Sequence, residues 1–359
     1  MDTGIAKRFE LSALRATVLA LLEKAGLQPE AAQAVTQVLL DADLIGHATH
    51  GLALVPWYLE AARSGAMQLV GAPEVVSDRG ACVVWNGHRL PGAWLASKAV
   101  DLAIQRADTY GTATLVIRDC GHVGALAAYM ARATERGMLL LMASSTPSVA
   151  GVAPFGGRKA VFTPNPIAAG IPTEGDPILL DISASITTLN RARQLAREGR
   201  SFPSEWVLDK DGSISADPAV VVSQGGSLLP VGGLDHGHKG YSLALLVEAL
   251  TQGLSGFGRA DAPSGTSVSL FVQVLDPSAF GGSTEFTRQT AHLAAACRDT
   301  PPVPGVDRVR VPGDRAAQAK KSALEHGVPL DDAILTGLQP WLDRYEMAMP
   351  APLDVNRPL

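Results

Sequence analysis

Apolar residues recur with a helical spacing at both ends of the chain. The segments with this spacing are residues 12–25, 29–45, 52–64, 315–325 and 330–345. Ser12 stands where the first helix begins and is expected to cap it, while Gly26 is expected to end it. The pattern therefore predicts three successive helices at the N-terminal end and two more near the C-terminal end.

The middle of the chain alternates apolar runs of strand length with segments of helical spacing, which predicts a mixture of strands and helices. The predicted strands are residues 74–77, 81–85, 112–117, 138–143, 177–181 and 267–275, the first two forming a hairpin. The predicted helices are residues 93–107, 126–136, 187–198, 240–254 and 287–298. Two stretches rich in turn-forming residues, 144–172 and 201–230, are predicted as loops, the first with short strands.

This order of elements suggests how the chain divides into domains. The terminal helices can pack together as one domain, with residues from about 75 to 300 inserted as a second. No glycine-rich G-x-G-x-x-G motif follows a predicted strand, because Gly256-Phe257-Gly258 lacks the third glycine. A Rossmann dinucleotide site and a P-loop are therefore not predicted.

Composition excludes several classes of protein. The 359 residues are 47% hydrophobic, which excludes a disordered chain, and the formal net charge of −5 offers no basic excess for nucleic acid. The three cysteines, Cys82, Cys120 and Cys297, lie too far apart for a zinc cluster or a disulfide framework. No apolar run reaches the length of a membrane helix, and the first residues lack the apolar region of a signal peptide. We expect a soluble cytoplasmic protein that binds neither membrane nor nucleic acid.

Two histidines stand in contexts that suit proton transfer or anion binding. His50, three residues after His47, falls at the junction of two predicted helices, where an imidazole can face a cleft or instead cap the preceding helix. His122 lies in Gly121–Gly124, between an apolar strand and a helix, where N–H groups can bind an anion. A plain glycine-rich connector has the same residues, so these residues alone leave both alternatives open.

An acid and a lysine mark two further candidate positions. Asp181 ends a predicted strand, where a carboxylate can bind a ribose or substrate hydroxyl, orient a histidine or cap the next segment. Lys239 precedes a predicted helix, where a cation opposes the helix dipole, so we expect it either to face a negative ligand or to be solvated. His236 and His238 lack further ligands at metal-binding spacing, and no metal site is predicted.

Seven segments of the chain, in order, resemble the malate/L-lactate dehydrogenase-like family, whose members lack a Rossmann fold. The resemblance extends from about residue 8 to residue 345. The family includes ureidoglycolate, sulfolactate and hydroxycarboxylate dehydrogenases and cyclic-imine carboxylate reductases. The matching segments are GHATHGLALVPWYLEAARSG (46–65), GHVGALAAYMA (121–131), VAPFGGRKAVFTPNPIAAGIP (152–172), LLDIS (179–183), LLPVGGLDHGHKGYSLALLVEAL (228–250), DPSAFGG (276–282) and VPGDRA (311–316).

The resemblance implies an α/β fold in which a non-Rossmann NAD(P)-binding domain with a mixed β-sheet is inserted between N- and C-terminal helices that pack as a second domain. The helical domain would comprise residues 1–75 plus 300–359, and the cofactor-binding and dimerisation domain residues 76–299. The family further implies a homodimer and hydride transfer between NAD or NADP and a 2-hydroxy or 2-oxo carboxylic acid.

The resemblance also implies roles for single residues. The family's catalytic histidine falls on His50, which would protonate the carbonyl oxygen as hydride arrives and take the proton back in the reverse direction. Asp181 would orient the reacting histidine or hold a ribose, and His122 is a rival for the acid–base role. The substrate-contacting positions would be Thr49, Leu54 and Tyr58. The cofactor-contacting positions would be Gly124, Ala125, Leu126, Leu179, Leu180, Asp181, Ile182, Ser183, His238, Lys239, Gly313, Asp314, Arg315 and Ala316.

Departures from the family pattern affect the expected substrate. Thr49 replaces the usual serine and keeps its hydroxyl, and Arg191 replaces a usual lysine. The arginine that most members carry shortly after the histidine, suited to a substrate carboxylate, is absent from residues 52–54. Leu54 and its aromatic neighbours instead form an apolar wall, which favours the hydroxycarboxylate dehydrogenase branch and bulky or aromatic 2-oxo acids.

Three functions therefore compete. The first is an NAD(P)-dependent 2-hydroxy acid dehydrogenase, supported by His50 and the seven segments. The second is a reductase of cyclic or N-methyl 2-imino acids, suggested by the missing arginine. The third is a cofactor-binding module without catalysis, and the presence of His50, Asp181 and Lys239 argues against it.

Overall fold

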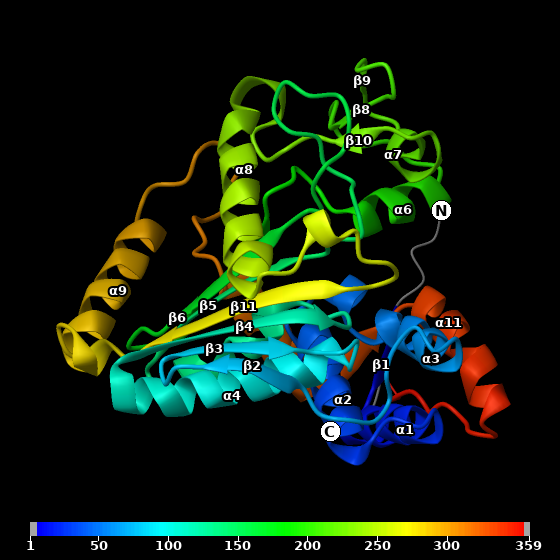
Figure 1. The fold of residues 1–359 in the computed structure, drawn as a ribbon, viewed down its shortest axis with the longest axis horizontal. Coiled ribbons are helices and arrows are strands. Elements are labelled where there is room, and N and C mark those ends of the chain that lie inside the picture. The colour runs from blue at the N-terminus through cyan, green and yellow to red at the C-terminus, as the bar shows by residue number, and fades with distance from the viewer. Residues whose placement is uncertain (1–5, 355–359) are drawn as a thin grey trace.

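A mixed seven-stranded sheet forms the centre of the computed structural model, which describes residues 6–354 (Figure 1). The strand order is β2-β3-β4-β11-β5-β6-β7; β3 and β4 pair in parallel, whereas the other neighbours in this order pair antiparallel. The strands are β2 (Glu74–Asp78), β3 (Cys82–Asn86), β4 (Thr112–Cys120), β5 (Leu139–Ser145), β6 (Pro166–Ile171), β7 (Ile178–Ser183) and β11 (Val268–Leu275). The predicted α/β class with a mixed sheet is confirmed. Residues 1–5 and 355–359, which the predicted helical domain includes, lie outside the described range.

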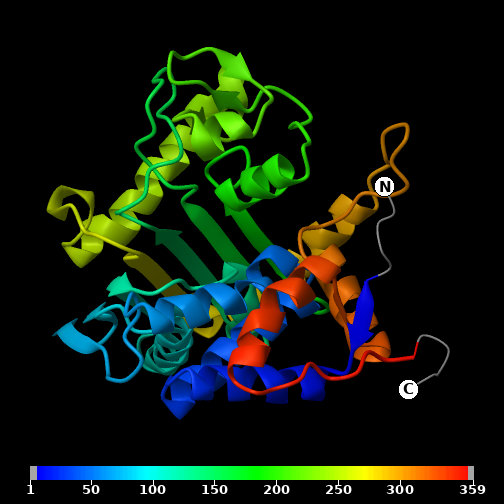
Figure 2. The ribbon, with the colours of Figure 1, turned by 90° about the vertical axis from the view of Figure 1, so that its right-hand side faces the viewer.

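Helices cover both faces of this sheet because its strands are apolar on both sides. Leu115 and Ile117 of β4 belong to the largest core, which α4 (Gly92–Tyr110) joins from one face. Between them, Val116 points the opposite way and packs with Phe271 and with Val247 of α8 (Gly233–Glu248). The helices α1 (Leu11–Lys24) and α2 (Pro29–Leu44) extend the largest core beyond α4 (Figures 1 and 2).

The two ends of the described chain lie side by side (Figure 2). β1 (Lys7–Phe9) pairs antiparallel with β12 (Val328–Leu330), a strand pair that the sequence pattern did not predict. Near it, α10 (Asp314–His326) packs against α2, and α11 (Asp332–Arg344) packs against α3 (Val55–Arg63). The division into domains at residues 75 and 300 stays a prediction.

A smaller lobe lies above the sheet in Figure 1. Its three-stranded sheet, in the order β10-β8-β9, has its own core around Val152, Phe162 and Phe202. These strands occupy the stretch 201–230 that was predicted as turns, because two-residue strands give no periodic signal. The elements are α6 (Leu189–Arg197), β8 (Val207–Leu208), β9 (Ile214–Ser215), α7 (Ala219–Ser223) and β10 (Ser227–Leu228).

The remaining elements are short helical turns and one long helix at the edge of the molecule. They are η1 (Ala48–His50), η2 (Leu52–Leu54), η3 (Leu126–Tyr129), α5 (Ala131–Thr134), η4 (Ala249–Gly253), η5 (Arg259–Asp261), η6 (Pro277–Ala279) and α9 (Ser283–Arg298). Within residues 6–354, no helix is both long and apolar enough to cross a bilayer.

Several predicted helix boundaries were wrong. Glu10, not Ser12, caps α1, because its carboxylate accepts the N–H groups of Ser12 and Ala13. The predicted helices 52–64 and 126–136 are each interrupted: η2 precedes α3 in the first, and η3 precedes α5 in the second. The predicted helix 240–254 starts earlier, at Gly233, and its last turn is the π-helix η4. The predicted terminal helix 330–345 begins only after β12.

Candidate active site

A tight turn between α2 and α3 presents His50. The N–H of His50 donates to the carbonyl of His47 at 2.8 Å, which closes η1. The Thr49 hydroxyl lies 3.0 Å from His50 Nδ1 and so orients the ring. Because Nδ1 has this neighbour and Nε2 has no hydrogen-bond partner in the described chain, Nε2 is the nitrogen available to a substrate.

The His122 loop lies against this turn. The two imidazoles are stacked, with ring centroids 6.2 Å apart and an angle of 18° between their planes. His122 Nδ1 accepts the N–H of Gly124 at 3.1 Å, so this nitrogen carries no proton and the ring is neutral. Trp57 packs edge-on against the His122 ring, and the buried Tyr58 donates its hydroxyl to the His122 carbonyl at 2.8 Å.

Asp181 of β7 completes the group. Its Oδ2 accepts the N–H of Ala127, in η3, at 2.9 Å. Its charge interacts with the imidazoles of His47 and His50. Three of the candidate positions named from the sequence, His50, His122 and Asp181, therefore come together in the fold.

Burial governs the protonation of these groups. It lowers the pKa of His50, although the nearby Asp181 carboxylate raises that pKa. Burial also lowers the pKa of His122 to about 4, and repulsion from His50 adds to this effect. The pKa of Asp181 is raised by burial, against the opposing effects of the Ala127 N–H and of His47 and His50. At neutral pH both imidazoles are therefore neutral, which prepares His50 to accept a proton.

β7 is the strand on which the other candidate loops meet. The N–H of Leu179 donates to the carbonyl of Pro312 at 3.0 Å, which holds the loop 313–316 beside the strand. At the other end, the N–H of Val231 donates to the carbonyl of Ala184 at 2.8 Å and anchors the start of α8. A Cβ at Gly240 would overlap these two backbones, so only glycine permits the close packing of α8 here.

A cleft of about 800 Å³ runs beside β7. Its walls include three of the predicted cofactor-contacting positions, Leu179, Gly313 and Ala316. Ala127, next to Asp181, and Lys320 of α10 also line it. This volume falls within the ordinary range of small-molecule and cofactor sites, and Lys320 supplies a cation that suits the diphosphate of a dinucleotide. His50, His122 and Asp181 do not line the cleft.

Other predicted positions lie elsewhere or have structural partners. His238 packs edge-on against Phe155, with centroids 5.7 Å apart, and neither residue lines the cleft. Lys239 is exposed and forms no ion pair or hydrogen bond within residues 6–354, and the break in α8 at His236 puts it in the first turn of the segment that follows. Asp314 pairs with Arg298 at 2.7 Å, and that guanidinium lowers the pKa of Asp314. Roles in cofactor binding for these residues stay predictions.

Tyr58 is one of the predicted substrate-contacting positions. Its side chain is fully buried, and its hydroxyl donates a hydrogen bond to the carbonyl of His122. Leu54, by contrast, is only half-buried, in the turn that follows His50. Substrate contact by Leu54 and Tyr58 stays a prediction.

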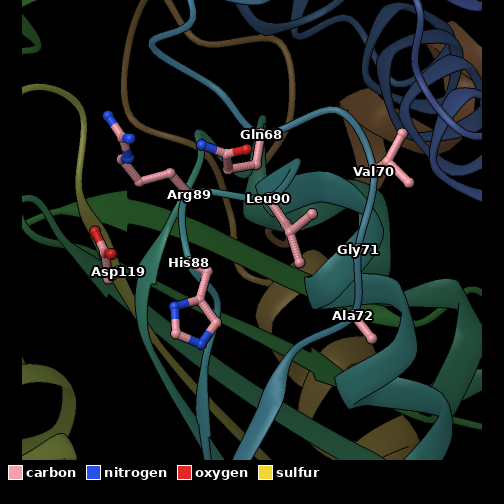
Figure 3. Close-up of a pocket in the computed structure, with 8 residues that line it drawn as sticks. All are labelled: Gln68, Val70, Gly71, Ala72, His88, Arg89, Leu90 and Asp119. Atoms are coloured by element: carbon pink, nitrogen blue, oxygen red, sulfur yellow. The ribbon is translucent and has the colours of Figure 1, made fainter.

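A second cavity, of about 410 Å³, lies between the segment Gln68–Ala72 and the turns at His88–Leu90 and Asp119 (Figure 3). His88, Arg89 and Asp119, which line it, all have a positive φ, so two strained turns face each other here. The N–H of Arg89 donates to the carbonyl of Asp119 at 2.7 Å, which joins the turns. None of the predicted site residues lines this cavity.

Two side chains close to the His50 turn, Asp43 and His47, were not predicted as site residues. Asp43 was taken only as one of the acids of the second helix, yet it is buried under the His50 turn. Its position four residues after Leu39, on the apolar face of α2, is the signal that would have found it. His47 was noted only as a neighbour of His50, and its interaction with Asp181 depends on a strand far away in the sequence.

Comparison with known proteins identifies the family. The family model described as malate/L-lactate dehydrogenase matches residues 9–339. An L-lactate dehydrogenase from Cupriavidus necator is 30% identical over 351 residues, which are 96% of this chain and 99% of that protein. The chain belongs to the malate/L-lactate dehydrogenase family. This confirms the resemblance seen in the seven segments, and the family is one of hydroxy acid oxidoreductases.

Other members of the malate/L-lactate dehydrogenase family show its range. A Δ1-pyrroline-2-carboxylate/Δ1-piperideine-2-carboxylate reductase from Pseudomonas syringae pv. tomato is 32% identical over 88% of this chain and 90% of that protein. Hydroxycarboxylate dehydrogenase B from Escherichia coli K12 is 27% identical over 92% of each. The solved structure of malate dehydrogenase from Pyrococcus horikoshii OT3 has a TM-score of 0.86 and 25% identity, covering 97% of this chain and 99% of that one.

The buried His122 leads to a prediction about stability at low pH. A histidine whose pKa is lowered on folding is neutral in both the folded and the unfolded state above its unfolded pKa, near 6.5. As the pH falls from there towards the folded pKa, the unfolded chain binds the proton first, and the protein loses stability. With a folded pKa of about 4, we expect the free energy of unfolding to fall by about 3 kcal/mol between these pH values. His122→Asn keeps an acceptor for the Gly124 N–H and removes this loss. Urea unfolding at a series of pH values measures this loss. If the free energy of unfolding fell equally steeply with falling pH in the wild type and in His122→Asn, the low pKa would not belong to His122.

Proposed function

We propose that this chain is an NAD(P)-dependent oxidoreductase that transfers a hydride between nicotinamide and a 2-hydroxy or 2-oxo carboxylic acid with a bulky or aromatic side chain. The observation that supports it best is the His50 imidazole, which has a free Nε2, a hydroxyl orienting Nδ1 and the Asp181 charge nearby. This is the arrangement of a general base and acid.

The residues present have distinct tasks in such a reaction. Residues 124–126, 179–183, 238–239 and 313–316 would hold a nicotinamide dinucleotide, which would supply or accept the hydride when bound. His50 Nε2 takes the hydroxyl proton of the 2-hydroxy acid and returns it to the carbonyl oxygen in the reverse direction. Asp181 stabilises the imidazolium formed in between, since its charge raises the pKa of His50. His122, with its pKa near 4, stays neutral and supports the stack.

The surroundings of the turn suggest the kind of substrate. Leu54 occupies the region where most members have a carboxylate-binding arginine, and Trp57 packs on the His122 ring beside it. An apolar wall favours a large apolar substituent on the acid. We therefore infer a preference for aromatic 2-oxo acids over small ones.

A substrate comparison tests this function. Purified protein should oxidise NADH or NADPH with phenylpyruvate, and kcat/KM should be about tenfold or more higher than with pyruvate. The change in nicotinamide absorbance measures both rates. A higher kcat/KM with pyruvate would contradict the inferred preference for aromatic substrates. Absence of turnover with every oxo acid would contradict the proposed function itself.

A reductase of cyclic or N-methyl 2-imino acids is the second candidate. The similarity to the pyrroline and piperideine carboxylate reductase favours it, together with the missing arginine. Relative kcat/KM for imines and oxo acids in one panel separates the two. Cofactor binding in calorimetry without turnover of either class would instead support a module without catalysis.

The oligomeric state, the cellular location and the partners of the protein are also proposals. We expect the protein to act as a homodimer in the cytoplasm on a small-molecule acid, without nucleic acid, membrane or metal. In the described range of residues 6–354, no group of three or more His, Cys, Asp and Glu side chains could hold a metal ion. The choice between NAD and NADP stays open.

A further inference from the structure

Asp43 is a buried acid that the proposed reaction does not use. It lies near the end of α2, with 5% of its surface exposed, on the face that packs under the His50 turn. Its Oδ2 accepts the N–H of Leu52 at 2.8 Å, two residues after His50. Its Oδ1 is buried and has no hydrogen-bond partner among residues 6–354.

The backbone of the turn after His50 packs directly against the Asp43 carboxyl group. A Cβ at residue 51 would overlap all three carboxyl atoms of Asp43, so the group lies directly against the backbone of Gly51. The N–H of Leu54 donates to the carbonyl of Gly51 at 3.0 Å, which links the contact to η2. Asp43 therefore touches the chain on the C-terminal side of His50, while the Thr49 hydroxyl orients the ring itself.

We propose that Asp43 is a positioning residue for His50: it holds the turn of residues 49–52 by accepting the Leu52 N–H and by filling the space that Gly51 leaves open. This inference rests on the proposed acid–base role of His50. Asp43 acts through the backbone and touches neither substrate nor cofactor. A displacement of the imidazole by about 1 Å is enough to slow a proton transfer step about 100-fold.

The partnerless Oδ1 makes the protonated form the one that suits this position. Burial raises the pKa of Asp43 to about 7, against the effect of the Leu52 N–H, and the negative Asp331 at the start of α11 raises it further. The other titratable groups of the turn are His47 and His50, both on η1 and its N-cap. Above neutral pH Asp43 ionises, and a buried carboxylate with an unpaired oxygen is expected to strain the turn.

Three variants test the role of Asp43. Asp43→Ala removes the acceptor and leaves a void under Gly51. Asp43→Asn keeps the shape and the acceptor for Leu52 and removes the ionisation. Thr36→Ala is the matched control, because Thr36 is equally buried on α2, also has an unpartnered oxygen and lies two turns away from Asp43.

We expect Asp43→Ala to lower kcat by about 10- to 100-fold with little change in the KM for the cofactor. Thr36→Ala should keep the wild-type kcat, although it should lose about as much thermal stability as Asp43→Ala. Asp43→Asn should keep most of the kcat and, in the oxidative direction, where the neutral His50 ring is the active form, lose the decline of activity above pH 7. An NMR titration of the His50 imidazole should show a changed pKa in Asp43→Ala and the wild-type pKa in Thr36→Ala.

The outcomes separate this inference from the proposed function. If the wild type turns over a substrate but Asp43→Ala and Thr36→Ala have the same kcat, or Asp43→Asn is as impaired as Asp43→Ala, the positioning role is wrong. If the wild type turns over no oxo acid or imine, the proposed function fails, and the NMR titration still decides whether Asp43 sets the environment of His50.

Discussion

Replacing His50 with asparagine should lower kcat for 2-oxo acid reduction by about 100- to 10,000-fold, which is the usual contribution of a general acid. Asparagine can still approach the Thr49 hydroxyl, so the turn should keep its shape, but it cannot transfer a proton. Dissociation constants for NADH and NADPH should change little, because no predicted cofactor contact is removed. Stopped-flow rates and fluorescence titration of the cofactor measure the two quantities.

The pH profile adds a second, independent check on His50. Because burial lowers its pKa, the imidazolium needed to protonate a carbonyl is scarce at neutral pH, and the reductive rate should rise as the pH falls. The oxidative rate needs the neutral ring and should change in the opposite direction. Both trends should be absent from the residual activity of His50→Asn.

His88→Asn provides the matched control, since His88 is an exposed histidine that pairs with Glu74 and belongs neither to the cleft beside β7 nor to the His50–His122 stack. Its kcat should equal that of the wild type. If His50→Asn also retained the wild-type kcat, the acid–base assignment would pass to His122, the other imidazole of the stack.

The largest effect on stability is expected from Gly92→Ala. Gly92 begins α4, and a Cβ there would overlap the carbonyl of Gly121 and lie 2.6 Å from the carbonyl oxygen of His122. Neither atom can move freely, because the N–H of Gly121 donates to the carbonyl of Leu90 at 2.8 Å. We expect a loss of about 3 kcal/mol or more in the free energy of unfolding, together with most of the activity.

Gly281→Ala is the control for this substitution, since, apart from its two chain neighbours, no atom of residues 6–354 lies within 4 Å of the Cβ it would add. Its melting temperature should stay within a few degrees of the wild-type value, about the change expected for a surface substitution. Chemical denaturation of the three proteins gives the comparison. A Gly92→Ala protein as stable as Gly281→Ala would mean that α4 and the His122 loop are less closely packed than the structure has them.

Local sequence pattern predicted much of the site's framework. The junction position of His50 follows from hydrophobic periodicity, which ends where a helix ends. The predicted strand end at Asp181 was wrong, because β7 continues to Ser183 and Asp181 pairs with Ala168 inside it. The same reasoning failed for the start of α8, because Gly233–Lys239 are mostly polar and exposed and the helix is broken at His236. It also failed for β1, a three-residue strand whose partner lies more than 300 residues away.

By itself, the sequence determined the mixed α/β class, the family and the residues capable of acid–base chemistry, because periodicity and motif order are properties of neighbouring positions. The tertiary structure decided which of these residues meet. It brought His50, His122 and Asp181 together, placed His238 against Phe155, and buried Asp43 beneath Gly51. Such contacts depend on the packing of elements distant in the chain, and burial, which shifts the pKa values of these groups, exists only after that packing has formed.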